Sequence, residues 1–72
     1  MPEEYYEDEN YVLFRDCVAR AETDAAILVD LGEEGEHWFP KSQLHDDSEV
    51  FEKETNGDLI VKKWLAKDRG LF

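Results

Sequence analysis

The residues best suited to chemistry lie in one stretch, Glu36 to Glu49, which reads EHWFPKSQLHDDSE. Histidine, serine and carboxylate side chains bind metals or act as nucleophiles and general acids and bases. However, His37 and His45 have no i,i+4 or other recognised ligand spacing. Ser42 lacks the nucleophile elbow of a hydrolase. We therefore expect no metal, no cofactor and no catalytic residue, and we expect that the protein is not an enzyme.

The net charge of the chain limits which partners it can bind. Its 72 residues include 19 Asp and Glu but only 8 Lys and Arg, giving a charge of −11. This charge opposes direct binding of nucleic acid or an anionic membrane, because like-charge repulsion would replace counterion release. A basic host protein or nucleoprotein complex is the partner that the charge permits.

The carboxylates are concentrated in two segments. Residues 22–36 contain six acids and no base, residues 46–58 contain six acids and Lys53, and residues 62–69 contain four bases and one acid. Alternate residues of a strand lie about 6.5–7 Å apart, comparable with the spacing of phosphates along a nucleic-acid strand. Two acidic ribbons could thus mimic nucleic acid. The candidate contact residues are Glu22, Asp24, Asp30, Glu33, Glu34, Glu36, Asp46, Asp47 and Glu49.

Length and composition predict one small folded domain. A chain this short buries a thin core, for which 42% apolar residues suffice. The single cysteine, Cys17, excludes an internal disulfide and is expected to be a buried thiol. No apolar run approaches the roughly 18 residues that cross a bilayer, and the start MPEEYYEDEN lacks the pattern of a signal peptide. We expect a cytoplasmic protein.

The apolar pattern predicts a mainly β (α+β) fold. We expect a small twisted antiparallel sheet or partial barrel of four to five strands with one short C-terminal helix. Residues 1–10 form an acidic, partly flexible arm, and residues 11–72 form the domain. Strands are expected at 11–21, 25–31, 36–39, 48–55 and 58–62. We also expect a hairpin at 32–35, a helical turn at 42–44, a type I′ turn at 56–57 and one short helix within 63–72, with Gly70 as its C-cap. In the first strand, alternation places Val12, Phe14 and Val18 on one face and Leu13, Cys17, Ala19 and Ala21 on the other.

The core is expected to combine strand and helix residues. Its predicted members are Val12, Phe14, Ile27, Val29, Leu31, Trp64, Leu65 and one of Trp38 and Phe39, because adjacent strand residues point to opposite faces. We expect Trp38 to pack beside Trp64 under the helix; an exposed aromatic that binds a partner is the alternative. A buried Trp64 would make Trp64→Ala cost about 3–5 kcal/mol.

Two runs of the chain, AILVDLGEEGEHWFPKSQL and LIVKKWLAKDRGL, carry a resemblance. Together they resemble a group of small, acidic, mostly uncharacterised phage and prophage proteins with a W-[FI]-P-K-S-Q turn and a terminal W-hydrophobic-A helix. The resemblance covers residues 25–71. It implies a phage or mobile-element origin, and hence the cytoplasm of a host cell.

These observations lead to two hypotheses for function. In the first, the protein is an acidic phage-type inhibitor that mimics nucleic acid and blocks a basic nucleic-acid-binding surface of a host defence complex, as anti-CRISPR proteins do. In the alternative, it is a small protein–protein interaction module that uses exposed aromatics and its basic helix, and the acidity serves solubility only. Steep salt dependence of binding favours the first.

Overall fold

The computed structural model describes residues 4–6 and 10–71. These residues form five strands and one short C-terminal α-helix, which confirms the predicted mainly β fold. Their bounds are β1 Glu4–Tyr6, β2 Tyr11–Glu22, β3 Ala26–Asp30, β4 Glu36–Pro40, β5 Asn56–Lys62 and α1 Lys63–Asp68, with 3-10 turns η1 at Gly32–Glu34 and η2 at Lys41–Gln43. Of the predicted flexible arm at 1–10, residues 4–6 form β1 and Asn10 is a turn; residues 1–3 and 7–9 lie outside the described residues.

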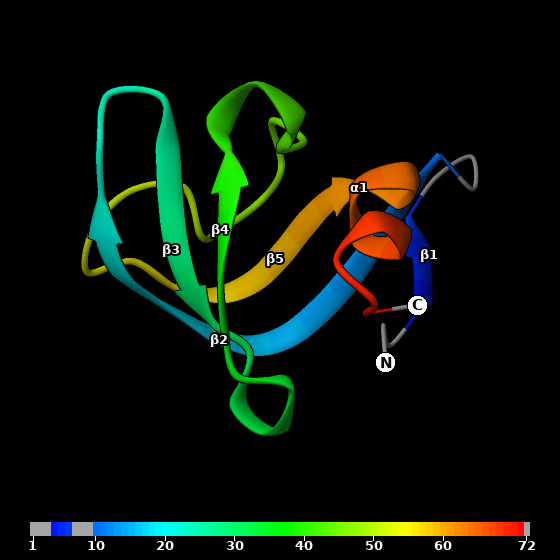
Figure 1. The fold of residues 1–72 in the computed structure, drawn as a ribbon, viewed down its shortest axis with the longest axis horizontal. Coiled ribbons are helices and arrows are strands. Elements are labelled where there is room, and N and C mark those ends of the chain that lie inside the picture. Colours follow the sequence, from blue (N-terminus) through cyan, green and yellow to red (C-terminus); the bar gives the residue numbers. More distant parts are fainter. Residues whose placement is uncertain (1–3, 7–9, 72) are drawn as a thin grey trace.

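The long strand β2 organises the sheet (Figure 1). Along one edge it pairs with β5, and along the other it pairs first with β1 and then with β3. β3 in turn pairs with β4, and all these pairings are antiparallel. The β3–β4 hairpin therefore lies at one end of β2, whereas β1 lies at the other.

The chain after β4 returns to the free edge of β5 and curls the sheet into a partial barrel. Leu44 forms a bridge with Val61, and the His45 N–H donates to the Ile60 carbonyl at 2.9 Å. Farther on, the Glu49 N–H donates to Asp58 O at 2.8 Å. Because β4 also pairs with β3, these bonds connect the two sides of the sheet around a common interior.

A bulge in β2 corrects the predicted faces of this strand. The register with β5 shifts between Phe14 and Cys17, and Asp16 has φ 58°, a left-handed conformation that Asp tolerates better than most residues. The extra residue reverses the alternation. As a result Cys17 and Ala19 join Val12 and Phe14 in the core, although the sequence pattern predicted that they lie on opposite faces.

Most of the residues predicted to form the core are buried, but the predicted burial of Trp38 and Trp64 is wrong. Phe39, not Trp38, is the buried member of its pair, with 0% against 43% exposure, and Trp64 is 57% exposed. Leu31 is only partly buried against the cluster. The core cluster consists of Val12, Phe14, Cys17, Ala19, Ile27, Val29, Phe39, Val50, Leu59, Val61, Leu65, Ala66 and Leu71.

The predicted strand at 48–55 and the turn at Asn56-Gly57 are wrong. Asn56 and Gly57 begin β5 and pair with β2, so they do not close a hairpin. The preceding segment turns instead, because the Thr55 hydroxyl donates to Glu52 O at 2.6 Å and accepts the N–H groups of Phe51 and Glu52. Glycine is favoured at position 57 for two other reasons: its φ is 126°, which residues with a Cβ rarely adopt, and an added Cβ would lie 2.4 Å from Glu49 Oε1.

The helix α1 ends at Asp68, and its C-cap is Arg69, not Gly70 as predicted; Gly70 is the next residue and turns the chain. This glycine has φ 76°, and the Leu71 N–H donates to Ala66 O at 2.9 Å. The turn brings Leu71 back into the core, where it is 3% exposed. Leu65, Ala66 and Leu71 thereby fasten the short helix to the sheet.

Cys17 is the buried thiol that the sequence predicted. Its side chain is 0% exposed, and burial raises the pKa of the thiol to about 12. The protonated thiol packs as a small apolar group within the core.

Candidate interaction surfaces

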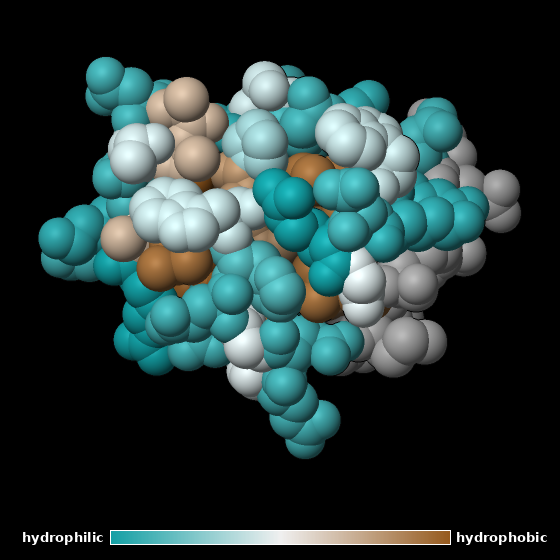
Figure 2. Space-filling model, in the orientation of Figure 1, coloured by the Kyte–Doolittle hydropathy of each residue, from teal (hydrophilic) through white to brown (hydrophobic). Residues whose placement is uncertain are grey.

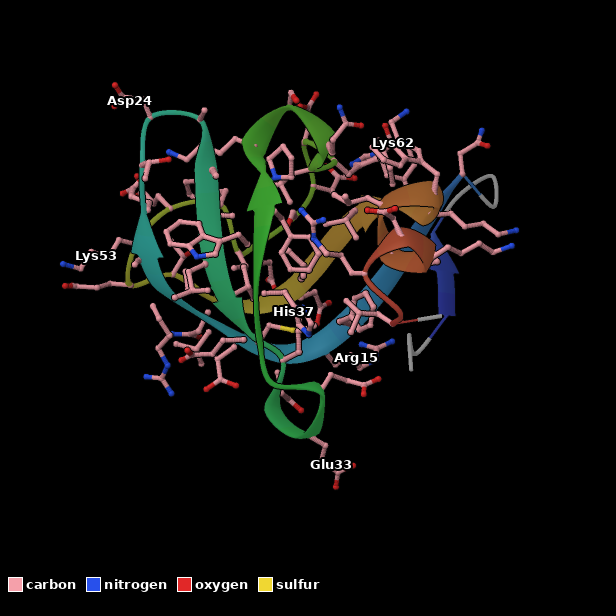
Figure 3. All side chains as sticks on the ribbon, in the orientation of Figure 1. Arg15, Asp24, Glu33, His37, Lys53 and Lys62 are labelled. Carbon is pink, nitrogen blue, oxygen red and sulfur yellow. The ribbon has the colours of Figure 1, made fainter. Side chains whose placement is uncertain are left out.

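The predicted carboxylates lie in separate groups and not in rows along strands. Glu33 projects from the turn between β3 and β4, and Asp24 lies at the opposite end of the hairpin (Figure 3). Three of the nine belong to strands, and each of these occupies the first or last position of its strand: Glu22, Asp30 and Glu36. The regular spacing expected of two acidic ribbons is therefore not formed.

The first group lies at the β3–β4 turn and comprises Asp30, Glu33, Glu34 and Glu36; we call it the hairpin-tip group. Asp30 is structural: it accepts the Gly32 N–H at 2.8 Å and the Arg20 guanidinium at 3.1 Å. These two contacts, the backbone bond first, hold the pKa of Asp30 below its ordinary value. The other three members are glutamates with exposed side chains.

Glu22 connects three segments of the chain. Its carboxylate lies 2.5 Å from Lys41 Nζ and accepts the Lys53 N–H at 3.1 Å. The bond from Lys41, followed by that from Lys53, lowers the pKa of Glu22. The residue therefore joins the end of β2 to the chain after β4 and to the turn before β5, which is a structural role.

Glu49 also has a structural contact. Its Oε1 accepts the Asp58 N–H at 2.9 Å, and its side chain covers Gly57. The glycine allows this close approach because it has no Cβ. Glu49 therefore holds the irregular chain after η2 against the start of β5.

The remaining candidates, Asp24, Asp46 and Asp47, are exposed in turns. The Asp47 N–H donates to His45 Nδ1 at 2.9 Å. The other histidine, His37, has its Nε2 3.0 Å from Glu34 O. Each ring thus contacts a nearby backbone group. Within residues 10–71, no group of three or more His, Cys, Asp or Glu side chains is placed to hold a metal ion.

Three large apolar side chains of the described residues are exposed. They are Trp38 at 43%, Phe51 at 51% and Trp64 at 57%. Figure 2 shows one face of the molecule, on which hydrophilic side chains predominate and the apolar areas are small. Phe51 lines a pocket of about 310 Å³ together with Lys41, Leu44, His45, Asp46 and Ser48.

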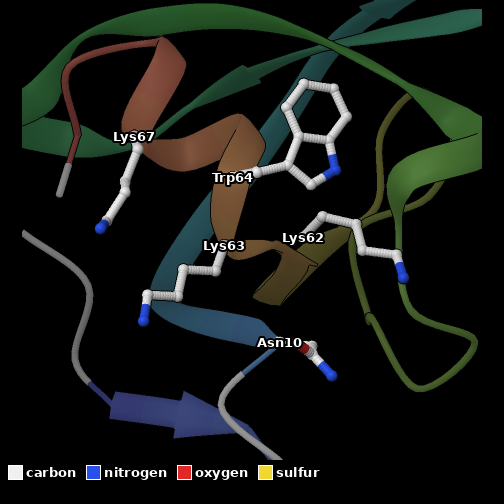
Figure 4. Close-up of a pocket in the computed structure, with 5 residues that line it drawn as sticks. All are labelled: Asn10, Lys62, Lys63, Trp64 and Lys67. Atoms are coloured by element: carbon white, nitrogen blue, oxygen red, sulfur yellow. The ribbon is translucent and has the colours of Figure 1, made fainter.

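A second pocket, of about 330 Å³, lies at α1 and is lined by Asn10, Lys62, Lys63, Trp64 and Lys67 (Figure 4). We call it the α1 pocket. The sequence indicated a basic tail, but we expected Trp64 to be buried and therefore did not predict this pocket. Adjacent lysines before an aromatic residue, with a further lysine one helical turn later, are the pattern that could have predicted it.

No protein-family model, no curated protein and no solved structure matches this chain. The resemblance to phage proteins therefore stays a prediction. In the part of the chain that the structure describes, α1 is far too short to span a bilayer, and no other helix qualifies.

Proposed function

We propose that the protein is a non-catalytic binding protein whose hairpin-tip group contacts a basic surface of a protein or nucleoprotein complex. The narrower form of the proposal is a phage-type inhibitor that blocks a nucleic-acid-binding surface of a host defence complex, as anti-CRISPR proteins do. The observation that carries it is the position of Glu33, Glu34 and Glu36, all exposed on one turn.

Two hydrogen bonds close the backbone of the turn. The Leu31 N–H donates to Gly35 O at 2.9 Å, and the Gly35 N–H donates to Gly32 O at 3.0 Å. Both glycines have positive φ, 78° and 84°, which residues with a Cβ rarely adopt. An ordered turn loses little conformational entropy when its carboxylates meet a basic partner, which supports a role in binding.

The test compares two charge-reversed variants of equal charge. Glu33→Lys with Glu34→Lys alters the turn, and Glu52→Lys with Glu54→Lys alters two exposed acids away from it; each pair adds four charges to −11, giving −7. We expect the immobilised parent to retain a nucleic-acid-binding complex from host lysate, to compete with DNA for it, and to release it in several hundred millimolar salt.

The turn variant should lose this complex, and the matched control should keep it. Equal loss by both variants would show that net charge alone is responsible. If both variants retain the complex, the hairpin-tip group does not contact it.

A second candidate function, a protein–protein interaction module, is favoured by the exposed indole of Trp38. Tryptophan is enriched among the residues that dominate binding energy at interfaces. If this function holds, binding should withstand salt and fall in Trp38→Ala. Phe39 is fully buried and is not available for such contacts.

A further inference from the structure

The outer face of the β3–β4 hairpin carries an apolar row that ends at Trp38. The register pairs Ala21 with Leu28 and Leu28 with Trp38, so these side chains lie next to one another across β2, β3 and β4. The neighbours of Leu28 along β3, Ile27 and Val29, are 0% exposed and point to the core. The row therefore lies on the opposite face of the sheet, where Trp38 is 43% exposed.

A carboxylate stands beside this row. Glu36 precedes Trp38 by two residues in β4, so it lies on the same face at about 6.5–7 Å along the strand. Its cross-strand neighbour Asp30 already accepts bonds from Arg20 and from the Gly32 N–H. The side chain of Glu36 is exposed and, among the described residues, makes no hydrogen bond or ion pair. An unpaired acid thus lies next to an exposed indole.

The backbone that carries the indole is held from two sides. Trp38 O accepts two bonds from the Arg69 guanidinium, at 3.2 and 3.1 Å, and the adjacent Phe39 is 0% exposed in the core. The Asp68 carboxylate lies 3.4 Å from Arg69 Nη1 and balances its charge. A contact residue ordered in this way loses less entropy on binding than a mobile one.

The pair of an indole and a carboxylate is suited to one kind of side chain above others. An indole face attracts a cation, and a carboxylate accepts hydrogen bonds from it. The arginine guanidinium does both at once, because it is planar, stacks on aromatic rings and is weakly hydrated. The lysine ammonium is a compact and strongly hydrated charge that loses more when it leaves water.

The surrounding charge excludes other occupants of this face. A purely apolar partner would cover Glu36 and leave a buried carboxylate without a partner, which is costly. An anionic partner would be repelled by Glu36, by Glu33 on the adjoining turn and by the net charge of −11. A cationic side chain with an apolar stem meets neither penalty.

We propose that Trp38, Leu28 and Glu36 form a binding site for an arginine side chain of the partner protein. The guanidinium stacks on the Trp38 indole and donates to the Glu36 carboxylate, while the aliphatic stem covers Leu28. This inference rests on the proposed function, because Glu36 belongs to the hairpin-tip group. It goes further in naming arginine as the residue that the basic partner presents.

The test compares two capped ten-residue peptides that carry a neutral dye, by fluorescence anisotropy at low salt. One contains three arginines and the other three lysines, each separated by glycine and serine, so that their charges are equal. We expect the arginine peptide to bind about fivefold more tightly, the size of an exposed cation–π contact. Equal dissociation constants would overturn the inference, since charge attraction alone would then be sufficient.

Two variants with matched controls locate the site. Trp38→Leu and Glu36→Gln should each raise Kd for the arginine peptide about threefold or more and reduce its advantage over the lysine peptide. Trp64→Leu removes the other exposed indole, and Glu52→Gln gives the same net charge as Glu36→Gln, −11 plus 1, or −10. Each control should change Kd less than twofold. Circular dichroism establishes that every variant keeps the fold.

Equal effects of a variant and its control, or no binding of either peptide at millimolar concentration, would overturn the inference. These outcomes differ from failure of the proposed function, which the lysate experiment tests with Glu33 and Glu34, outside this site. If the turn variant loses the host complex but Trp38→Leu retains it, the hairpin-tip group binds its partner without the arginine site.

Discussion

The β3–β4 hairpin and the segment from Lys62 to Asp68 use their aromatic residues in the same way but carry opposite charge. In each, one residue anchors the element and its neighbour points outward: Phe39 and Leu65 are 0% and 2% exposed, whereas Trp38 and Trp64 are 43% and 57% exposed. The hairpin ends in glutamates, and the helix carries lysines. In each region the smaller residue of the pair is buried, so the tryptophan beside it stays exposed and available to contact a partner. The charge around each tryptophan then favours a partner of the opposite charge.

Removing the anchors should have the largest effect. Phe39→Ala leaves a cavity beside Ile27 in the core and should lower the free energy of unfolding by about 3–5 kcal/mol. Trp38→Ala and Trp64→Ala remove exposed rings and should each cost less than about 1 kcal/mol. Urea denaturation measures all three. A loss above about 3 kcal/mol in Trp64→Ala would mean that the indole is buried against the rest of the protein in solution, and that Trp64 is not an exposed contact residue like Trp38.

A change to the link between the two regions should have an intermediate effect. The Arg69 guanidinium donates to Trp38 O from Nε at 3.2 Å and from Nη2 at 3.1 Å, so it fastens the end of the helix to the edge of β4. Arg69→Met keeps the stem but removes these bonds. Because the side chain is partly exposed, we expect a loss of about 1 kcal/mol in urea denaturation.

Arg69→Lys is the control for charge, since it keeps the positive charge without the guanidinium geometry. It should recover only part of the stability. Full recovery would show that the charge near β4, and not the pair of hydrogen bonds, stabilises the link.

The smallest effect concerns the base of the hairpin and depends on pH. The pKa of Asp30 is below its ordinary value of 3.8 in the folded state, so the unfolded chain takes up its proton at a higher pH. The stability contributed by Asp30 is thus complete above pH 3.8 and is lost as pH falls through the lowered pKa. Asp30→Asn should be less stable than the parent at pH 7.

The difference in unfolding free energy between Asp30→Asn and the parent should become smaller as pH falls below about 4, the ordinary range of an Asp pKa. Urea midpoints measured for both proteins at pH 7 and at low pH test this. A difference that does not change with pH would mean that Asp30 acts through its shape and not through its charge.

The sequence predicted the elements of the fold well in segments where the apolar residues follow a single pattern and glycine marks the turn. The apolar run of β3 and the two glycines at the turn defined the hairpin, and Gly70 marked the turn that follows α1. These features act over a few residues, so the sequence is sufficient to predict them.

Features that depend on three-dimensional neighbours were not predictable in this way. The face of Cys17 depends on the left-handed conformation of Asp16, which alternation does not reveal. The role of Gly57 depends on the Glu49 side chain above it, and not on a turn. In the same way the α1 pocket needs Asn10, which is remote in sequence from the lysines and reaches them through the pairing of β2 with β5.

The burial of Cys17 makes site-specific labelling possible without any change to the native cysteine. Burial raises the pKa of this thiol to about 12, so little of the reactive thiolate forms at pH 8, and the sulfur has no surface exposure. A maleimide dye would therefore react with a cysteine introduced by Glu33→Cys or Lys67→Cys and leave the core untouched. An environment-sensitive dye placed at one position and then at the other would report whether a partner covers both ends of the molecule or only one.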